Sequence, residues 1–255
     1  MAQAIIDRKK LLGFINGFGE NIEDILLEIK DNRIYGAVDT PTHYCEKSIG
    51  IMVANEVKYR PGKVYVNDVA KVATFLKASS QDLCIMTQWE GSFNLKIGNN
   101  ALNIPSHTHI RSAMTIDRAK AAIQEMRNNN FTKIGPSPLN VNGNINVIEM
   151  KGMEVGVKVA GKEAPCRIRV NPTDAEMVIT MGNIVGGANM SRTIDLASVW
   201  GDVETTTYFG SHLPSTLRCM DSGIVDFYMG EQSALVLDHQ EEDTLLILKH
   251  QQGVN

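Results

Sequence analysis

A pattern of strands and turns occurs twice in this sequence, at an offset of 141 residues. Residues 25–38 read as an apolar run, a turn and a second alternating run, and residues 166–181 repeat that order. Residues 75–86, which lead through a polar turn into a strand-like run, have a counterpart at 216–229. The offset exceeds the roughly 20–50 residues of solenoid repeats, so the pattern predicts two copies of a whole domain.

The composition is that of an ordinary globular protein, with 255 residues of which 43% are hydrophobic and 21% charged. We expect no membrane span, because no apolar stretch approaches ~18 residues, and no signal peptide. A formal net charge of −4 argues against a uniformly basic surface, although a basic stripe can lie on an acidic body. The cysteines form no Cys-x-x-Cys pair and are expected to be buried free thiols in a reducing compartment: Cys45, Cys84, Cys166 and Cys219.

Hydrophobic periodicity predicts an α+β fold built from helices and antiparallel sheets. Each half of the chain is expected to hold a helix, strands, a second helix and a strand meander. The expected helices cover residues 5–22, a stretch that starts at Asn67, residues 151–163 and residues 208–221. A further helix is expected over Asp117–Arg127, between the two halves.

These elements predict two tandem domains, residues 1–112 and 144–255, with a connector over residues 113–143. Residues 39–44 are expected to form a loop. The expected strands lie at residues 25–30, 33–38, 46–55, 58–66, 83–89, 93–97, 101–104, 144–150, 166–171, 176–182, 187–199, 224–230, 233–239 and 244–250.

Candidates for catalysis are few. His43 with Cys45, and His107 with His109, have metal-like spacing, but no further ligands follow at a recognisable distance in the sequence. The glycine clusters lack the Lys-Ser/Thr of a phosphate-binding loop, and no hydrolase motif is present. We therefore favour structural roles for these residues and expect no catalytic residue, no metal and no cofactor.

Cations gather in the four expected helices of the two halves, which carry few acids. In one such helix alone, the cations would be interpreted as an ordinary solvent-exposed helix face. Four helices with the same bias at matched places favour a shared basic surface that faces phosphate. The cations are Arg8, Lys9, Lys10, Lys71, Lys77, Lys151, Lys158, Lys162 and Arg218.

This order of elements resembles the DNA sliding clamps, both the proliferating-cell nuclear antigen type and the T4-type phage clamps. The most specific local matches are residues 8–12, 76–82, 38–43, 179–184 and 233–237. The resemblance implies a DNA polymerase processivity factor with two clamp-type domains. It implies a homotrimeric ring around duplex DNA, with helices lining the inside and sheets outside.

The resemblance also implies roles for individual residues. The cations expected to line the hole are Lys9, Lys10, Lys77 and Arg218, followed by Lys71, Lys158 and Lys162. The expected apolar pocket for a partner peptide consists of Val38, His43, Leu139, Leu235 and Ile247. Subunits are expected to join edge to edge, about 101–107 against about 184–193, through Leu102, Ile104, Ile184 and Met190. The implied partners are non-specific double-stranded DNA, a DNA polymerase and a clamp loader.

The sequence departs from the clamp pattern in its connector helix and in the run Leu245–Leu248, which replaces an expected aromatic residue. These departures suggest a divergent member, such as a bacteriophage or other viral clamp. The implied location is the host cytoplasm for a phage protein and the nucleus for a eukaryotic one.

Two alternatives stay open. A monomeric or dimeric viral processivity factor would grip DNA directly. A metal-dependent enzyme would use His107 and His109 with Asp39 or Glu90.

Overall fold

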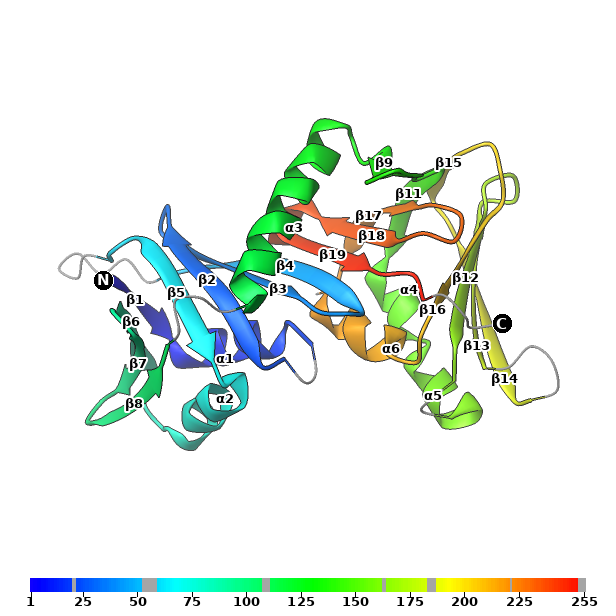
Figure 1. Cartoon of the computed structure of the whole chain (residues 1–255). Helices are drawn as coiled ribbons and strands as arrows, with labels where there is room; N and C mark the ends of the chain where they lie inside the picture. The colour runs from blue at the N-terminus through cyan, green and yellow to red at the C-terminus, as the bar shows by residue number, and fades with distance from the viewer. Residues whose placement is uncertain are drawn as a thin grey trace. The chain divides into compact units, whose positions relative to one another are not determined.

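The computed structural model divides into two compact units (Figure 1). Unit 1 comprises Met1–Asp39 and Cys45–Arg118, and unit 2 comprises Thr40–Tyr44 and Ala119–Asn255. Much of the predicted connector, from Ala119 onward, therefore clusters with unit 2. The structure describes residues 1–19, 22–51, 59–106, 111–161, 164–182, 187–220 and 222–251.

Unit 1 contains two sets of antiparallel strands. The first set has the order β1-β6-β7-β8, and the second has the order β4-β3-β2-β5. The strands of the first set are β1 (Ala2–Asp7), β6 (Leu83–Trp89), β7 (Ser92–Ile97) and β8 (Asn100–Pro105). Those of the second are β4 (His43–Gly50), β3 (Arg33–Asp39), β2 (Asp24–Lys30) and β5 (Gly62–Asn67).

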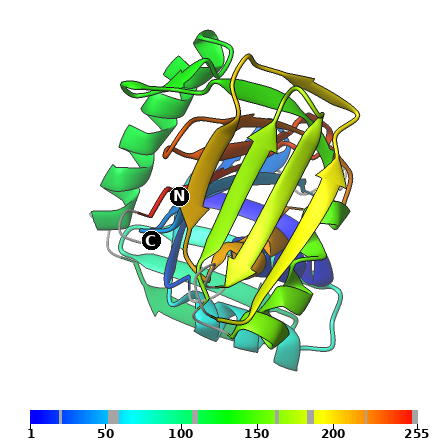
Figure 2. The same ribbon diagram turned by 90° about the vertical axis from the view of Figure 1, so that its right-hand side faces the viewer.

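Unit 2 repeats this arrangement with the orders β11-β17-β18-β19 and β14-β13-β12-β16. The first set is β11 (Val141–Asn146), β17 (Ile224–Met229), β18 (Leu235–His239) and β19 (Thr244–Leu248), with β15 (Ser198–Trp200) beside β11. The second is β14 (Asn189–Asp195), β13 (Glu176–Gly182), β12 (Cys166–Asn171) and β16 (Thr205–Phe209), and Figure 2 shows it nearest the viewer.

The duplication predicted from the sequence is thus present in the fold. Strand β17 begins at Ile224, which is 141 residues after the start of β6 at Leu83. Each strand of the two sheets in unit 1 has a counterpart in unit 2 at the same place in the sheet order. The predicted α+β class with antiparallel sheets is confirmed.

The helices of unit 1 follow β1 and β5. Helix α1 (Arg8–Asn16) begins at Asp7, whose carboxylate accepts a hydrogen bond of 2.8 Å from Lys10 N–H. Helix α2 (Val69–Ala78) begins at Asp68, not at the predicted Asn67. The predicted helix over residues 5–22 is wrong at both ends. Residues 2–7 alternate buried and half-buried side chains and form β1, and the helix ends at Asn16, before Gly17.

The helices of unit 2 are shorter than predicted. Helices α4 (Val147–Lys151) and α5 (Glu154–Ala160) replace the single helix expected over residues 151–163. Helix α6 (Leu213–Thr216), with Pro214 in its first turn, continues into the 3-10 turn η1 (Leu217–Cys219). The predicted start at residue 208 is wrong because residues 205–209 form β16.

The segment before β11 is a helix and a short hairpin. Helix α3 (Arg111–Asn128) includes the predicted residues 117–127, and the hairpin consists of β9 (Lys133–Ile134) and β10 (Ser137–Pro138). The ring centroids of Phe131 and Tyr228 lie 4.8 Å apart, which fixes this segment to β17. A last 3-10 turn, η2 (Gln240–Glu242), precedes β19.

All four cysteines are buried thiols that form no disulfide. Burial raises the pKa of the Cys84 thiol to about 12, and nearby Asp7 adds to the rise. Burial also raises the pKa of the Cys166 thiol to about 12. Among the described residues, no helix has the length and apolar character that crossing a membrane requires.

Candidate nucleic-acid interface

Exposed lysines cluster on the helices of unit 1. Lys9 and Lys10 lie in the first turn of α1, and Lys77 lies in the last turn of α2, which packs against α1. Neither helix contains an acidic residue. Within the described ranges, no carboxylate forms an ion pair with any of these three lysines. Their charges are therefore directed to solvent and are open to an anion.

Two other cations of unit 1 have partners. Arg8 donates from Nε to Gln81 O at 2.9 Å and from Nη1 to Leu76 O at 2.8 Å, which ties α1 to the end of α2. Lys71 forms an ion pair with Asp68, and both side chains are exposed. The hydrogen bonds that Asp68 accepts from the Lys71 side chain and backbone lower the pKa of its carboxyl. Arg8 is therefore a structural residue, and Lys71 is a partly neutralised one.

The predicted cations of unit 2 differ in their surroundings. Arg218 Nε lies 2.9 Å from Glu154 Oε1, and this ion pair joins η1 to α5. Lys151, at the end of α4, donates to Met220 O at 2.6 Å. Lys158 is exposed on α5. Lys162 lies outside the described residues.

The ion pairs formed by the acids of α4 and α5 were not predicted from the sequence. Glu154 holds Arg218, and Glu149 forms an ion pair with Arg192 of β14. The partners are 64 and 43 residues apart in the chain, so neither pair has a local sequence signature. Besides Lys158, the exposed residues of these helices are apolar: Ile148, Val155 and Val159, each more than half exposed.

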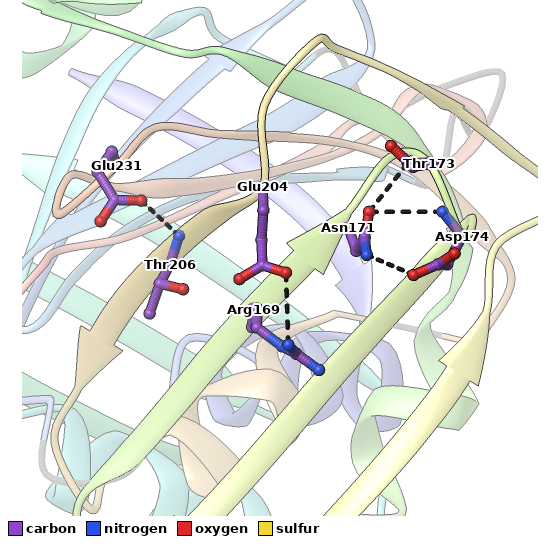
Figure 3. A network of polar contacts seen from close by, with 7 residues as sticks. All are labelled: Arg169, Asn171, Thr173, Asp174, Glu204, Thr206 and Glu231. Atoms are coloured by element: carbon purple, nitrogen blue, oxygen red, sulfur yellow. Dashed lines mark hydrogen bonds and ion pairs between the residues drawn. The ribbon is translucent and has the colours of Figure 1, made fainter.

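A further polar network of unit 2 lies on β12 and β16 (Figure 3). Arg169 Nη1 lies 3.3 Å from Glu204 Oε2, and Glu231 accepts a hydrogen bond of 2.6 Å from Thr206 N–H. Arg169 alternates along β12 with the buried side chains of Ile168 and Val170, so it projects from the opposite face of the strand. This network is separate from the ion pairs of α4 and α5.

The predicted peptide pocket does not form one open surface. All five of its residues are buried. Leu235 pairs with Leu248 and Val236 pairs with Ile247, so the side chains of Leu235 and Ile247 point to opposite faces of the sheet. The five residues are Val38, in unit 1, and His43, Leu139, Leu235 and Ile247, in unit 2.

His43 sits in a polar corner of unit 2. Its Nδ1 lies 3.1 Å from the hydroxyl oxygens of Thr40 and Thr42. His212, at the start of α6, has a lowered pKa because of its burial and the proximity of His43. Burial and the nearby His43 therefore favour the neutral form of His212.

The predicted subunit contacts fall on edge strands. Strand β8, with Leu102 and Ile104, and strand β14, with Met190, each lie at the end of a strand order in the described part of the chain. Leu102 and Met190 are partly exposed, whereas Ile104 is buried. Ile184 lies outside the described residues.

Two of the four residues of the metal-site alternative lie in the described part of the chain. Asp39 ends β3, and Glu90 lies in the turn between β6 and β7. His107 and His109 lie outside the described residues. In the ranges that are described, no group of three or more His, Cys, Asp or Glu side chains has a metal-binding arrangement.

Solved structures of clamps share this architecture. A DNA polymerase sliding clamp from Pseudomonas aeruginosa superposes with a TM-score of 0.72 at 13% identity, over 99% of this chain and 65% of that one. A Helicobacter pylori β clamp bound to a DNA ligase peptide gives a TM-score of 0.70 at 9% identity, over 98% and 67%. The chain has the fold of a DNA sliding clamp.

A third clamp, the DNA polymerase III β chain from Streptococcus pneumoniae, gives a TM-score of 0.71 at 12% identity, over 99% and 65%. The chain spans about two thirds of the length of these clamps. No protein-family model matches the sequence, and no curated protein matches it. The clamp fold expected from the resemblance is therefore confirmed by structure at an identity too low to carry function by itself.

Proposed function

We propose that this protein is a sliding clamp, a non-catalytic processivity factor that encircles duplex DNA as a ring of identical copies and tethers a polymerase. The duplicated clamp architecture carries the proposal. The open lysines of α1 and α2 and the two edge strands β8 and β14 support it.

The repeat itself suggests how copies join. In unit 2, strand β19 is followed by Lys249, whose backbone N–H donates to Thr42 O at 2.9 Å and whose Nζ donates to Thr40 O at 2.6 Å. Strand β19 therefore ends beside the residues that lead into β4. The counterparts of β19 and β4 in the duplicated order are β8 and β14, both of which are edge strands. We infer that β8 of one copy pairs with β14 of the next, which closes a head-to-tail ring of three.

The lysines suit a clamp that slides. Lys9, Lys10 and Lys77 are flexible point charges that can attract any phosphate without reading a base. Phosphate contacts of this kind bind all sequences alike and weaken as salt rises. Lys71 and Lys158 are secondary candidates, as are Lys162 and Arg218.

A polymerase and a clamp loader are the proposed partners, and one clamp of the same fold was solved with a DNA ligase peptide. Of the predicted pocket residues, His43, Leu139 and Ile247 remain candidates in unit 2. Their burial means that a partner peptide would have to displace part of their cover. The proposed location is wherever the DNA is replicated, the host cytoplasm for a phage protein or the nucleus for a eukaryotic one.

Light scattering over a dilution series tests the ring first. The expected mass is about 84 kDa, three times 28.1 kDa. A stable 28.1 kDa species would contradict the ring and favour a factor that grips DNA as a monomer.

A topological assay separates these two modes. A ring placed on nicked circular DNA by its loader should stay bound and leave when the circle is cut. A direct gripper would bind both forms alike, and a protein that never stimulates primer extension by its cognate polymerase would contradict both.

A further inference from the structure

Two cations at matched positions have opposite surroundings. Lys77 and Arg218 are 141 residues apart. Lys77 lies in the last turn of α2, and Arg218 lies in η1, which continues α6. Lys77 is exposed on a helix that has no acidic residue, whereas Arg218 Nε is 2.9 Å from Glu154 Oε1. The same position therefore offers an open charge in unit 1 and a neutralised one in unit 2.

The carboxylate of Glu154 has no counterpart in unit 1. The position 141 residues before Glu154 is Gly13, which is exposed on α1. A glycine there leaves no carboxylate beside the lysines of unit 1. A Cβ built on Gly13 meets no atom within 4 Å, so α1 has room for a side chain at this position.

Glu154 also lies one turn before Lys158 on α5, the spacing and order in which a glutamate attracts a lysine. The neighbouring exposed positions are Ile148, Val155 and Val159. Aliphatic side chains offer no donor to a phosphate. Lys151 donates to Met220 O, so Lys158 is the exposed cation among the described residues of α4 and α5.

We propose that Glu154 is an attenuator of DNA binding, which keeps the helices of unit 2 from gripping phosphate so that unit 1 of each copy holds the duplex. This inference rests on the proposed function, because it says which helices of a DNA-binding clamp bind DNA more strongly. A ring must hold DNA weakly enough to move, and neutralising one helix surface in two lowers the number of phosphates held at once.

Two reciprocal variants test the proposal. Binding to a linear duplex of about 30 base pairs would be followed by fluorescence anisotropy across a salt series. Glu154→Gln should remove the ion pair between Glu154 and Arg218, tighten binding about twofold to fivefold at low salt and steepen the salt slope by about 0.9 for each phosphate gained. Gly13→Glu should do the reverse, since a carboxylate at position 13 lies one turn from both Lys9 and Lys10.

The matched control is Glu204→Gln. It removes the same charge and frees Arg169, whose exposure resembles that of Arg218, but on strand β12 (Figure 3). Its effect on affinity should be under twofold. Equal gains from Glu154→Gln and Glu204→Gln would mean that net charge alone sets the affinity, which would overturn the proposal.

A second pair of variants distinguishes a failure of the Glu154 proposal from a failure of the proposed clamp function. Lys77→Ala should weaken binding, whereas Arg218→Ala should change it little unless Glu154→Gln is also present. If Lys77→Ala and Arg218→Ala weaken binding equally, the attenuator is wrong and the clamp stands. If neither they nor the Lys9→Ala, Lys10→Ala double variant changes salt-dependent binding, the DNA surface itself is wrong. Melting curves of each variant establish that the fold is retained.

Discussion

In unit 1, the helices α1 and α2 are nine and ten residues long. In unit 2, the matching stretches form the shorter helices α4, α5 and α6, of five, seven and four residues, and the 3-10 turn η1. The strand order is nevertheless the same in both units. Each strand is held by backbone pairing with its neighbours in the sheet, so a shifted register would move its apolar side chains to the wrong face. A helix needs only to bury one stripe, which short pieces can also do.

The two units thus differ where a surface is free to diverge. Helices α1 and α2 keep open lysines, while α4 and α5 carry acids and exposed valines. Duplication provided two copies of one scaffold, and the exposed lysines Lys9, Lys10 and Lys77 lie on the helices of the first copy, which contain no acid. The variants below, in order of decreasing effect, break or sharpen this comparison.

The largest effect should come from Leu102→Lys on β8. A charge pointing inward at an edge is a known barrier to strand pairing, and Leu102 is only half-buried, so the ammonium can reach water. Light scattering should show a fall from about 84 kDa to 28.1 kDa at micromolar concentration. The control is Leu83→Lys on the interior strand β6, where the ring should persist. A ring that survives Leu102→Lys would mean that subunits join elsewhere.

The matched core positions Met86 and Phe227 lie 141 residues apart, and both are buried. In the Leu102→Lys background, Met86→Ala should lower the free energy of unfolding of unit 1 by about 2–5 kcal/mol, and Phe227→Ala that of unit 2 by about 3–5 kcal/mol. Urea unfolding would be followed with Trp89 or Trp200 as the single tryptophan, one in each unit. If either variant shifts both signals equally, the units unfold as one block.

The helix caps should give smaller, similar effects. Asp7→Ala removes the acceptor for Lys10 N–H at the start of α1, and Asn146→Ala removes the acceptor for Ile148 N–H at the start of α4. Each should lower the free energy of unfolding by about 1 kcal/mol. Thermal melts would measure this, with Asn16→Ala on exposed α1 surface as the control within about 0.5 kcal/mol. No loss from Asn146→Ala would mean that packing alone holds α4.

The smallest effect should be a pH response confined to unit 2. The pKa of His212 is lowered from 6.5 by burial and by His43, so the unfolded chain binds a proton more readily than the folded one. The stability of unit 2 should therefore be highest above pH 6.5 and should fall as the pH drops below that value. The position 141 residues earlier is Lys71, an exposed lysine paired with Asp68, so unit 1 has no histidine at this place. An identical pH slope in wild type and His212→Gln would contradict this assignment.

The strands were predictable because alternation is a local property. The pattern of Leu83–Trp89 and its repeat at Ile224–Met229 could be read directly from the sequence. The helix ends were less accessible. Ala2–Asp7 has alanines and isoleucines that suit a helix, and only pairing with β6 makes it a strand. The predicted start of the helix over residues 208–221 is wrong for the same reason, because Tyr208 and Phe209 belong to β16, which pairs with β12.

The candidate site was predictable as a set of cations but not as a set of open charges. Lys77 and Arg218 look alike in the sequence, and what separates them is Glu154, which is 64 residues from Arg218. Likewise, Leu235 and Ile247 both read as apolar strand residues. Their opposite orientation follows from the β18–β19 register, which the sequence leaves undetermined.

The two unlike edges, β8 and β14, have a genetic consequence. In a head-to-tail ring every copy must offer both edges, so one copy with a blocked β8 leaves a gap that no other copy can fill. In a cell that made wild-type and Leu102→Lys chains equally and assembled them at random, only about one trimer in eight would contain three intact β8 edges. Such an allele would therefore be dominant over the wild type, whereas a substitution on the helices would be diluted by its neighbours.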